Sequence, residues 1–298
     1  MIGTREPPQE PRRPAGRALL LLAAVTLVGV AAVTCARADD GADFPAHWWT
    51  PVPREGAPQW EVLPQEAGPG FEAKKAGDLA EENMRRMQGV RATFHRDMTQ
   101  IASKRTLAIL AAGGALAGVC ALVEDPAPGV DAREGHWWDA SSDVGNTAGN
   151  VATIGAVTGT VLLVGHLSGS ESLTLTGSEL ARSVIYSAGI TLALKAATQR
   201  TRPNGEPYSF PSGHSAAMFS VAPVLAARYG VLAAAPAYLL AGVTAFGRVE
   251  EREHFPSDVV FGAALGLASG VAVVRSDAAS SSVSITVRPG AIGLTARF

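Results

Sequence analysis

The sequence predicts an all-α fold, a six-helix bundle with a short C-terminal β-hairpin. Of the 298 residues, 47% are hydrophobic and 17% are charged, whereas an average soluble domain has about 25% charged residues. Apolar segments rich in Ala, Gly, Val and Leu alternate with polar loops, and small residues allow helices to pack closely. The six segments span about 106–123, 146–168, 178–198, 213–229, 231–247 and 257–274.

The first part of the chain has the pattern of an export signal. Arginines within residues 12–17 precede an apolar run, residues 18–34, and the small-residue sequence Ala-Arg-Ala follows at 36–38. This order is typical of a cleaved secretory signal. We therefore expect residues 1–38 to be removed and the protein to be exported to the periplasm or cell envelope. An uncleaved membrane anchor is the alternative.

Residues 39–105 are expected to form an exported lead-in with one amphipathic helix, which precedes the bundle at 106–276. The apolar members of this helix recur every three or four residues, so they form one stripe that is expected to pack on the main domain. The tail, residues 277–298, alternates polar and apolar residues around Pro289 and Gly290, which predicts the hairpin. The apolar stripe consists of Met84, Met87, Val90, Phe94, Met98 and Ile101.

Whether the six segments cross a membrane stays open at this point. A spanning helix needs about 20 predominantly apolar residues, but Glu179 and Arg182 interrupt the third segment and Pro223 and Arg228 the fourth. The signal would place the start of the first segment outside, while the positive charges of residues 104–105 favour the cytoplasm. We interpret the conflict as favouring a membrane-associated bundle that does not fully span.

Composition argues against two classes of function. The formal net charge is -2 and no strongly basic face is evident, so nucleic acid is not an expected partner. The two cysteines, Cys35 and Cys120, have no CxxC or Cys/His cluster nearby, so no metal site is expected. The sequence His-Trp-Trp at 47–49 and again at 136–138 is typical of a lipid–water interface, although it would equally cover the end of a bundle.

Three short polar clusters flank the predicted helices. Hairpin connections that alternate in direction bring the end of the third helix, the start of the fourth, the end of the fifth and the start of the sixth to one end of the bundle. The three clusters are therefore expected to meet there. They are Lys195 with Arg202, then Pro211-Ser212-Gly213-His214, then Arg248 with His254 and Asp258.

These clusters have complementary chemistry for a phosphate ester. Arginine and lysine bind phosphate oxygens, and the N-terminus of a helix that starts at Ser212-Gly213 attracts an anion. A histidine on each side supplies a nucleophile and a proton donor, and a carboxylate four residues after His254 would fix its tautomer. Taken singly, each cluster also fits an ordinary role: solvated helix-end cations, a plain turn and cap, or a salt-bridged loop.

The order K-x6-RP, PSGH and R-x5-H-x3-D, over residues 195–258, resembles the three-part signature of the type 2 phosphatidic acid phosphatase and vanadium haloperoxidase superfamily, in its acid phosphatase branch. One departure is Gly247, where the family usually has serine before the arginine. The resemblance implies that His254 is the nucleophile and forms a phosphohistidine, that His214 protonates the leaving group, that Asp258 orients His254, and that no metal or other cofactor is needed. It implies that the phosphate is bound by Lys195, Arg202, Ser212, Gly213 and Arg248.

We therefore expect a metal-independent phosphatase that acts on a phosphomonoester or pyrophosphate, with a lipid phosphate, such as phosphatidic acid or an undecaprenyl carrier, as the favoured substrate. A soluble periplasmic acid phosphatase for small phosphate esters is one alternative. A haloperoxidase with vanadate as its cofactor is another, although Ser215 after His214 and the short chain count against it. The third is a non-catalytic envelope protein, which only the Gly247 departure supports.

Overall fold

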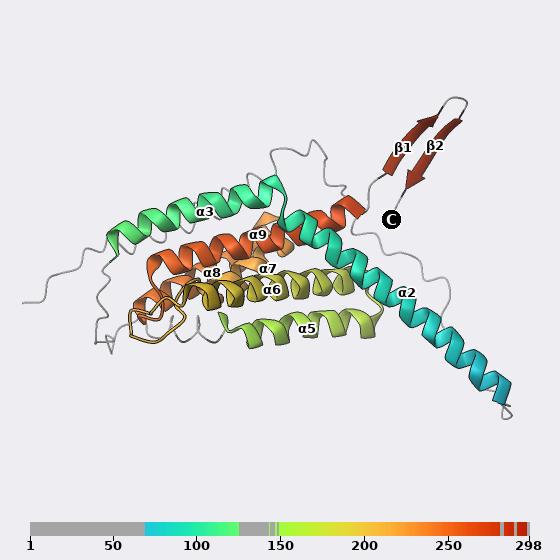
Figure 1. Cartoon of the computed structure of the whole chain (residues 1–298), viewed down its shortest axis with the longest axis horizontal. Coiled ribbons are helices and arrows are strands. Elements are labelled where there is room, and N and C mark those ends of the chain that lie inside the picture. Colours follow the sequence, from blue (N-terminus) through green and yellow to red (C-terminus); the bar gives the residue numbers. More distant parts are fainter. Residues whose placement is uncertain are drawn as a thin grey trace, which may run out of the picture.

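The computed structural model describes residues 69–124 and 149–280, the strand residues 283–288 and 291–296, and the single residues 143 and 147. The predicted signal peptide, Cys35, both His-Trp-Trp sequences and most of the loop after residue 124 lie outside the described residues. The described part is mostly helical, as the sequence predicts (Figure 1). Its helices are α2 (Pro69–Ile101), α3 (Lys104–Val123), α5 (Val151–Ser168), α6 (Glu171–Thr198), α7 (Gly213–Tyr229), α8 (Val231–Glu250) and α9 (Pro256–Ser280).

The described residues thus form seven helices, where the sequence predicted a core of six. The six apolar segments correspond to α3 and α5 to α9, and the seventh helix, α2, contains the predicted amphipathic segment and also contacts α9. The strands β1 (Val283–Arg288) and β2 (Ala291–Ala296) pair antiparallel, with Val287 opposite Ile292.

Side-chain caps explain why two helices start elsewhere than predicted. The side chain of Ser170 accepts a hydrogen bond from the N–H of Leu173, so α6 starts at Glu171 rather than near residue 178. Asn150 caps α5 in the same way through the N–H of Ala152. Both residues satisfy N–H groups that the first turn of a helix leaves unpaired.

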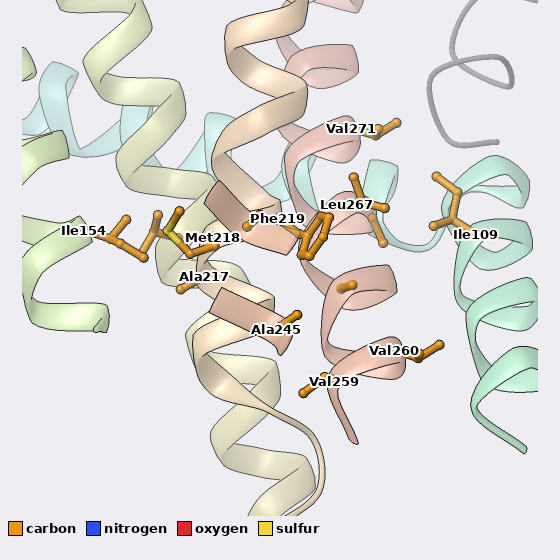
Figure 2. Packing of buried hydrophobic residues seen from close by; sticks show 14 of the residues in the cluster. Ile109, Ile154, Ala217, Met218, Phe219, Ala245, Val259, Val260, Leu267 and Val271 are labelled. Atoms are coloured by element: carbon orange, nitrogen blue, oxygen red, sulfur yellow. The ribbon is translucent and has the colours of Figure 1, made fainter. Parts of the chain in front are cut away.

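Helix α9 lies at the centre of the bundle and contacts α2, α3, α6, α7 and α8. Ile109 of α3 packs on one side of α9, and Phe219 of α7 packs on the other, beside Leu267 (Figure 2). Glycines allow the close approach of α7, because a Cβ atom added at Gly266 would lie 2.2 Å from the carbonyl oxygen of Ala216. Gly262 and Gly270 meet the backbone of α7 in the same way, one turn to either side.

The outer helices carry large apolar side chains on their exposed faces. Among the described residues, α3, α5, α8 and α9 are long and apolar enough to cross a membrane. The apolar stretch of α9 is 89% buried inside the bundle, but those of α3, α5 and α8 are only 22%, 17% and 33% buried. Exposed apolar surface of this extent is typical of a face that contacts lipid or a partner. The exposed side chains include Leu122, Val157, Leu167, Leu232 and Leu239.

Helix α2 is attached to the bundle through a buried charge in addition to the last residues of its apolar stripe. The Asp97 side chain is fully buried and accepts hydrogen bonds from Nη1 of Arg182, at 3.0 Å to each carboxylate oxygen, and from the hydroxyl of Tyr186 at 2.7 Å. Arg182 also pairs with Asp277 of α9. The helix packs on the main domain, as predicted, but only through its C-terminal part, where Met98 and Ile101 of the stripe are half-buried and the stripe before them is exposed, including Met87 at 71%. The other exposed members are Met84, Val90 and Phe94.

Replacing Asp97 by alanine is expected to lower the free energy of unfolding by about 3 kcal/mol, because it leaves the guanidinium of Arg182 without its fully buried carboxylate partner. Glu81→Ala is the matched control, since it removes an exposed carboxylate of the same helix that pairs with Arg85 and exposed pairs contribute about 0–1 kcal/mol. Thermal unfolding of both variants in detergent measures the difference. Equal stability of the two would contradict the proposed attachment of α2.

Candidate active site

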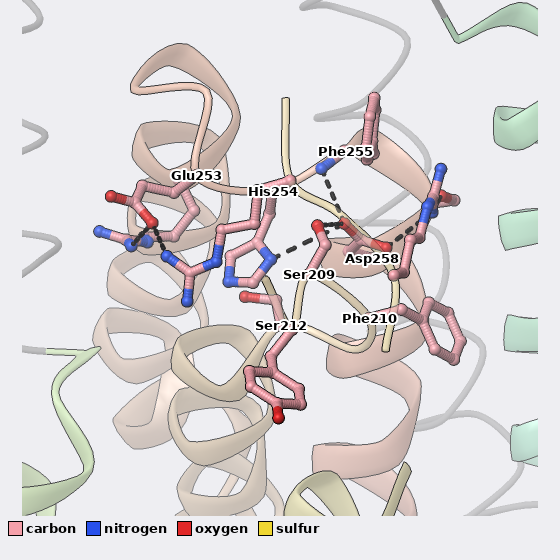
Figure 3. A network of polar contacts seen from close by, with 12 residues as sticks. Ser209, Phe210, Ser212, Glu253, His254, Phe255 and Asp258 are labelled. Carbon is pink, nitrogen blue, oxygen red and sulfur yellow. Dashed lines mark hydrogen bonds and ion pairs between the residues drawn. The ribbon is translucent and has the colours of Figure 1, made fainter. Parts of the chain in front are cut away.

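The three predicted clusters lie at one end of the bundle, where α6 and α8 end and α7 and α9 begin (Figure 3). The N–H of Ser212 donates to the carbonyl of Asp258 over 3.0 Å, which joins the second cluster to the third. Arg202 forms an ion pair with Glu253, next to His254, which joins the first cluster to the third. The eight residues that the order of the helices predicted to meet therefore lie at the same end of the bundle. They are Lys195, Arg202, Ser212, Gly213, His214, Arg248, His254 and Asp258.

The start of α7 is shaped by Ser212. Its side chain is fully buried, and its hydroxyl accepts a hydrogen bond from the N–H of Ser215, at 3.4 Å, as the N-cap of the helix. Gly213 is the first helical residue and His214 the second. N–H groups in the first turn of a helix have no intrahelical acceptor, and the helix dipole adds positive potential there. This end of α7 is therefore suited to bind an anion.

The predicted cations are held in place by carboxylates and carbonyls. Arg248 contacts Glu251 at 2.9 Å and Glu253 at 3.1 Å, and Glu253 also pairs with Arg202. Lys195 donates to the carbonyl of Ser209 over 3.4 Å and to that of the preceding residue. Burial, together with the two guanidiniums, lowers the pKa of Lys195 to about 8. An arriving anion would stabilise the charged form of this lysine.

His254 is buried beside Asp258. The imidazole is 3% exposed, and its Nδ1 lies 3.7 Å from Oδ2 of the carboxylate. This distance is longer than a hydrogen bond, so the predicted pair is adjacent but not directly bonded in the structure. Burial lowers the pKa of His254, and the positive charges of Lys195 and Arg248 oppose the raising effect of Asp258. The imidazole is therefore expected to be neutral at neutral pH.

His214 experiences the same positive environment. A Cβ atom added at Gly149 would lie 3.2 Å from its Cδ2, so the ring packs against the segment before α5. Burial lowers the pKa of His214 to about 4, and the nearby positive charge of Arg248 contributes to the shift. A bound phosphate would reverse part of this shift, because a negative charge favours the protonated imidazole.

The carboxylate of Asp258 is surrounded by donors that the sequence did not reveal. Its Oδ2 accepts hydrogen bonds from the hydroxyl of Ser209 and, at 2.9 Å, from the N–H of Phe255. Its Oδ1 accepts from Arg200 at 2.7 Å. Ser209 precedes the Pro-Ser-Gly-His sequence by two residues, and Arg200 lies inside the first motif. Their closeness to the motifs is the sequence signal that could have identified them as partners of Asp258. Nothing in the local sequence indicates that Glu124, at the end of α3, also reaches Arg200.

Gly247 is buried in the last turn of α8, directly before Arg248. Among the described residues, no group of three or more His, Cys, Asp or Glu side chains is arranged to hold a metal ion.

Comparison with known proteins finds a match over this region. The model of the PAP2 superfamily matches residues 176–281, which include every predicted site residue. A solved structure of a transmembrane PAP2-type phosphatidylglycerolphosphate phosphatase from Bacillus subtilis is also similar, with 22% sequence identity, 63% of this chain and 94% of that chain covered, and a TM-score of 0.35. No curated protein matches the chain.

Proposed function

Residues 176–281 of this chain belong to the PAP2 superfamily, and from this premise we propose that the protein is a phosphatase that hydrolyses a phosphomonoester or pyrophosphate through a phosphohistidine. The observation that supports it is the meeting, at one end of the bundle, of three cations, a helix N-terminus, the buried His254 and the half-buried His214. This arrangement provides both the charge that holds a phosphate and the two groups that its hydrolysis requires.

In the proposed first step, Lys195, Arg202 and Arg248 hold the phosphate oxygens and the start of α7 adds its N–H groups. The neutral His254 attacks phosphorus with Nε2, while Nδ1 faces Asp258. A phosphorus–nitrogen bond forms as the bond to the leaving oxygen breaks, and protonated His214 gives its proton to that oxygen. The negative charge that develops on the phosphate oxygens is stabilised by the fixed cations.

In the proposed second step, the roles of His214 reverse. The now neutral imidazole takes a proton from a water molecule, which attacks phosphorus and breaks the bond to His254. Inorganic phosphate leaves, His254 is neutral again and His214 is protonated again, so the cycle closes. We propose that neither step needs a metal or other cofactor, because the three cations and the helix N-terminus supply the positive charge that phosphoryl transfer requires.

We propose a lipid phosphate as the substrate and a membrane as the place of reaction. The outward faces of α3, α5 and α8 carry large apolar side chains, as a lipid-facing surface does. The site lies at one end of these helices, where the headgroup of a lipid would meet it. We further propose that this end faces the outside of the cytoplasmic membrane, following the predicted export signal. A soluble acid phosphatase for small esters remains the alternative.

Phosphate release from a set of substrates tests this function. Purified protein is expected to release phosphate from phosphatidic acid in mixed micelles faster than from the soluble ester p-nitrophenyl phosphate, and to keep its activity in EDTA. His254→Ala, measured in parallel, controls for contaminating phosphatases. A preference for the soluble ester would favour the soluble acid phosphatase, and loss of activity in EDTA would contradict the metal-independent mechanism.

A further inference from the structure

Arg200 lies inside the first motif, and its guanidinium makes three hydrogen bonds at this end of the bundle. It directly follows Gln199, which ends α6 in a left-handed conformation with φ 46°. Its Nη1 donates to Oδ1 of Asp258 and to the hydroxyl of Ser257, each at 2.7 Å. Its Nη2 donates to Oε2 of Glu124 at 2.9 Å. One guanidinium therefore connects the ends of three helices.

The arginine is held in this orientation from several sides. The guanidinium lies over the ring of Phe255, with 4.2 Å between its central carbon and the ring centroid. Its backbone carbonyl accepts a hydrogen bond of 2.7 Å from the N–H of Ser209, whose hydroxyl donates to Asp258. The backbone and the side chain of Arg200 thus both determine where donors to Asp258 lie.

Glu124 completes the arrangement from the far side. Its side chain is only 4% exposed, and its Oε1 accepts a hydrogen bond from the N–H of Ser257 in the first turn of α9. The carboxylate therefore satisfies an unpaired N–H group of the helix start and balances the charge of Arg200. Through this residue the end of α3 is fixed to the turn that carries Asp258.

These contacts matter because the pair of His254 and Asp258 is not held by a direct hydrogen bond. The 3.7 Å between Nδ1 and Oδ2 leaves the orientation of the carboxylate to its other partners. Arg200 fixes Oδ1, so that Oδ2 is the oxygen nearest His254. We propose that Arg200, supported by Glu124, is a positioning residue that sets the carboxylate of Asp258 and, through it, the orientation and tautomer of His254.

This inference rests on the proposed function and assigns Arg200 a role different from that of the other cations. Its side-chain hydrogen bonds described above go to the carboxylates of Asp258 and Glu124 and to the hydroxyl of Ser257. A residue of this kind changes the rate of the chemical step, whereas a phosphate ligand also changes substrate binding. The two roles predict different effects on kcat and on KM.

The test compares Arg200→Gln, Arg200→Lys and Glu124→Gln with the wild-type enzyme. Arg200→Gln is expected to lower kcat about 10–100-fold, as loss of a partner that orients a catalytic group does, with KM nearly unchanged. Arg200→Lys should recover part of the loss, since lysine keeps one charged donor. Glu124→Gln should lower kcat less than Arg200→Gln. Arg252→Gln removes a cation from the neighbouring loop and is expected to behave as the wild type.

The pH profile separates positioning from a purely structural role. Asp258 raises the pKa of His254, so a misplaced carboxylate lowers that pKa. The part of the profile in which activity rises with pH, as His254 loses its proton, is therefore expected to move to lower pH in Arg200→Gln. A variant that is merely less stable would keep the wild-type profile, and thermal unfolding measures stability independently.

The outcomes distinguish this inference from the proposed function. The wild type could be active while Arg200→Gln either equals it or shows a raised KM with unchanged kcat. Either result would overturn the positioning role and leave the proposed function standing. If Arg200→Gln does not fold, Arg200→Lys and Glu124→Gln decide by the same two readouts. A wild type that releases no phosphate, with the fold intact, would overturn the function and this inference with it.

Discussion

Replacing His254 by alanine is expected to reduce phosphate release by a factor on the order of 10⁴ or more, because it removes the group that forms the bond to phosphorus. The side chain is buried beside Asp258, and the described structure offers no second imidazole in an equivalent position. Initial rates with a saturating substrate measure the loss. His166→Ala is the matched control, since this exposed histidine lies in α5 near the other end of the bundle.

Two outcomes would contradict this prediction or the assay. If His254→Ala folds like the wild type by circular dichroism and retains its rate on each substrate, His254 is not the nucleophile. A loss of the same size in His166→Ala would indicate that the assay reports general damage to the protein.

Replacing His214 by alanine is expected to lower kcat/KM, which reports the steps up to departure of the leaving group, about 10²–10⁴-fold, the usual contribution of a general acid. The loss should depend on the leaving group. An alkyl alcohol, as in phosphatidic acid, needs the proton, while nitrophenolate leaves without it, so the nitrophenyl ester should lose much less. Equal losses on both substrates would contradict the role of His214 as the proton donor.

The pH dependence follows from the same two histidines. His214 must carry a proton to act as the acid, and its pKa is lowered to about 4, so kcat/KM of the free enzyme falls as pH rises through that value. His254 must be neutral, and its pKa is also lowered, so it loses its proton at acidic pH. Maximal kcat/KM is therefore expected in the acidic range. In His214→Ala the decline with rising pH should disappear, and a wild-type profile that climbs into the alkaline range would contradict the assignment.

The sequence predicted the composition of the site because its main parts are short-range. The run from Pro211 to His214 contains both the cap and the first turn of α7, and the spacing from His254 to Asp258 places the two on neighbouring turns. The alternation of helix directions then brings these parts together. Each of these features depends on residues close in sequence or on the order of the helices.

Contacts between residues far apart in the chain could not be predicted from local sequence patterns. Glu124 and Arg200 are far apart in the chain, and neither position carries a local signal of the other. The periodicity of α2 correctly predicted a helix that packs on the main domain, but periodicity shows only that a face is apolar and not which part of that face contacts the bundle. In the structure Asp97 attaches the helix, and a single charged residue in a polar stretch gave no indication of burial.

The sequence does not show how the polar residues inside two apolar segments are satisfied. Glu179 of α6 and Arg228 of α7 form a two-point ion pair, with 2.7 Å between Arg228 Nε and Glu179 Oε2, so they satisfy each other inside the bundle. Segments α3, α5 and α8 are apolar on all sides, and their sequences therefore do not show which face is exposed. Only the packing shows that their large apolar side chains point outward.

The central claim is that His254 becomes phosphorylated during turnover. Incubation with a ³²P-labelled phosphate ester, followed by a rapid quench with alkali, tests it directly, since a phosphorus–nitrogen bond survives alkali and is broken by acid. We expect label on the peptide that contains residue 254. This label should be lost after acid treatment and should be missing from His254→Ala. Label on any other residue, or rapid phosphate release by the wild type with label never found on His254, would contradict it.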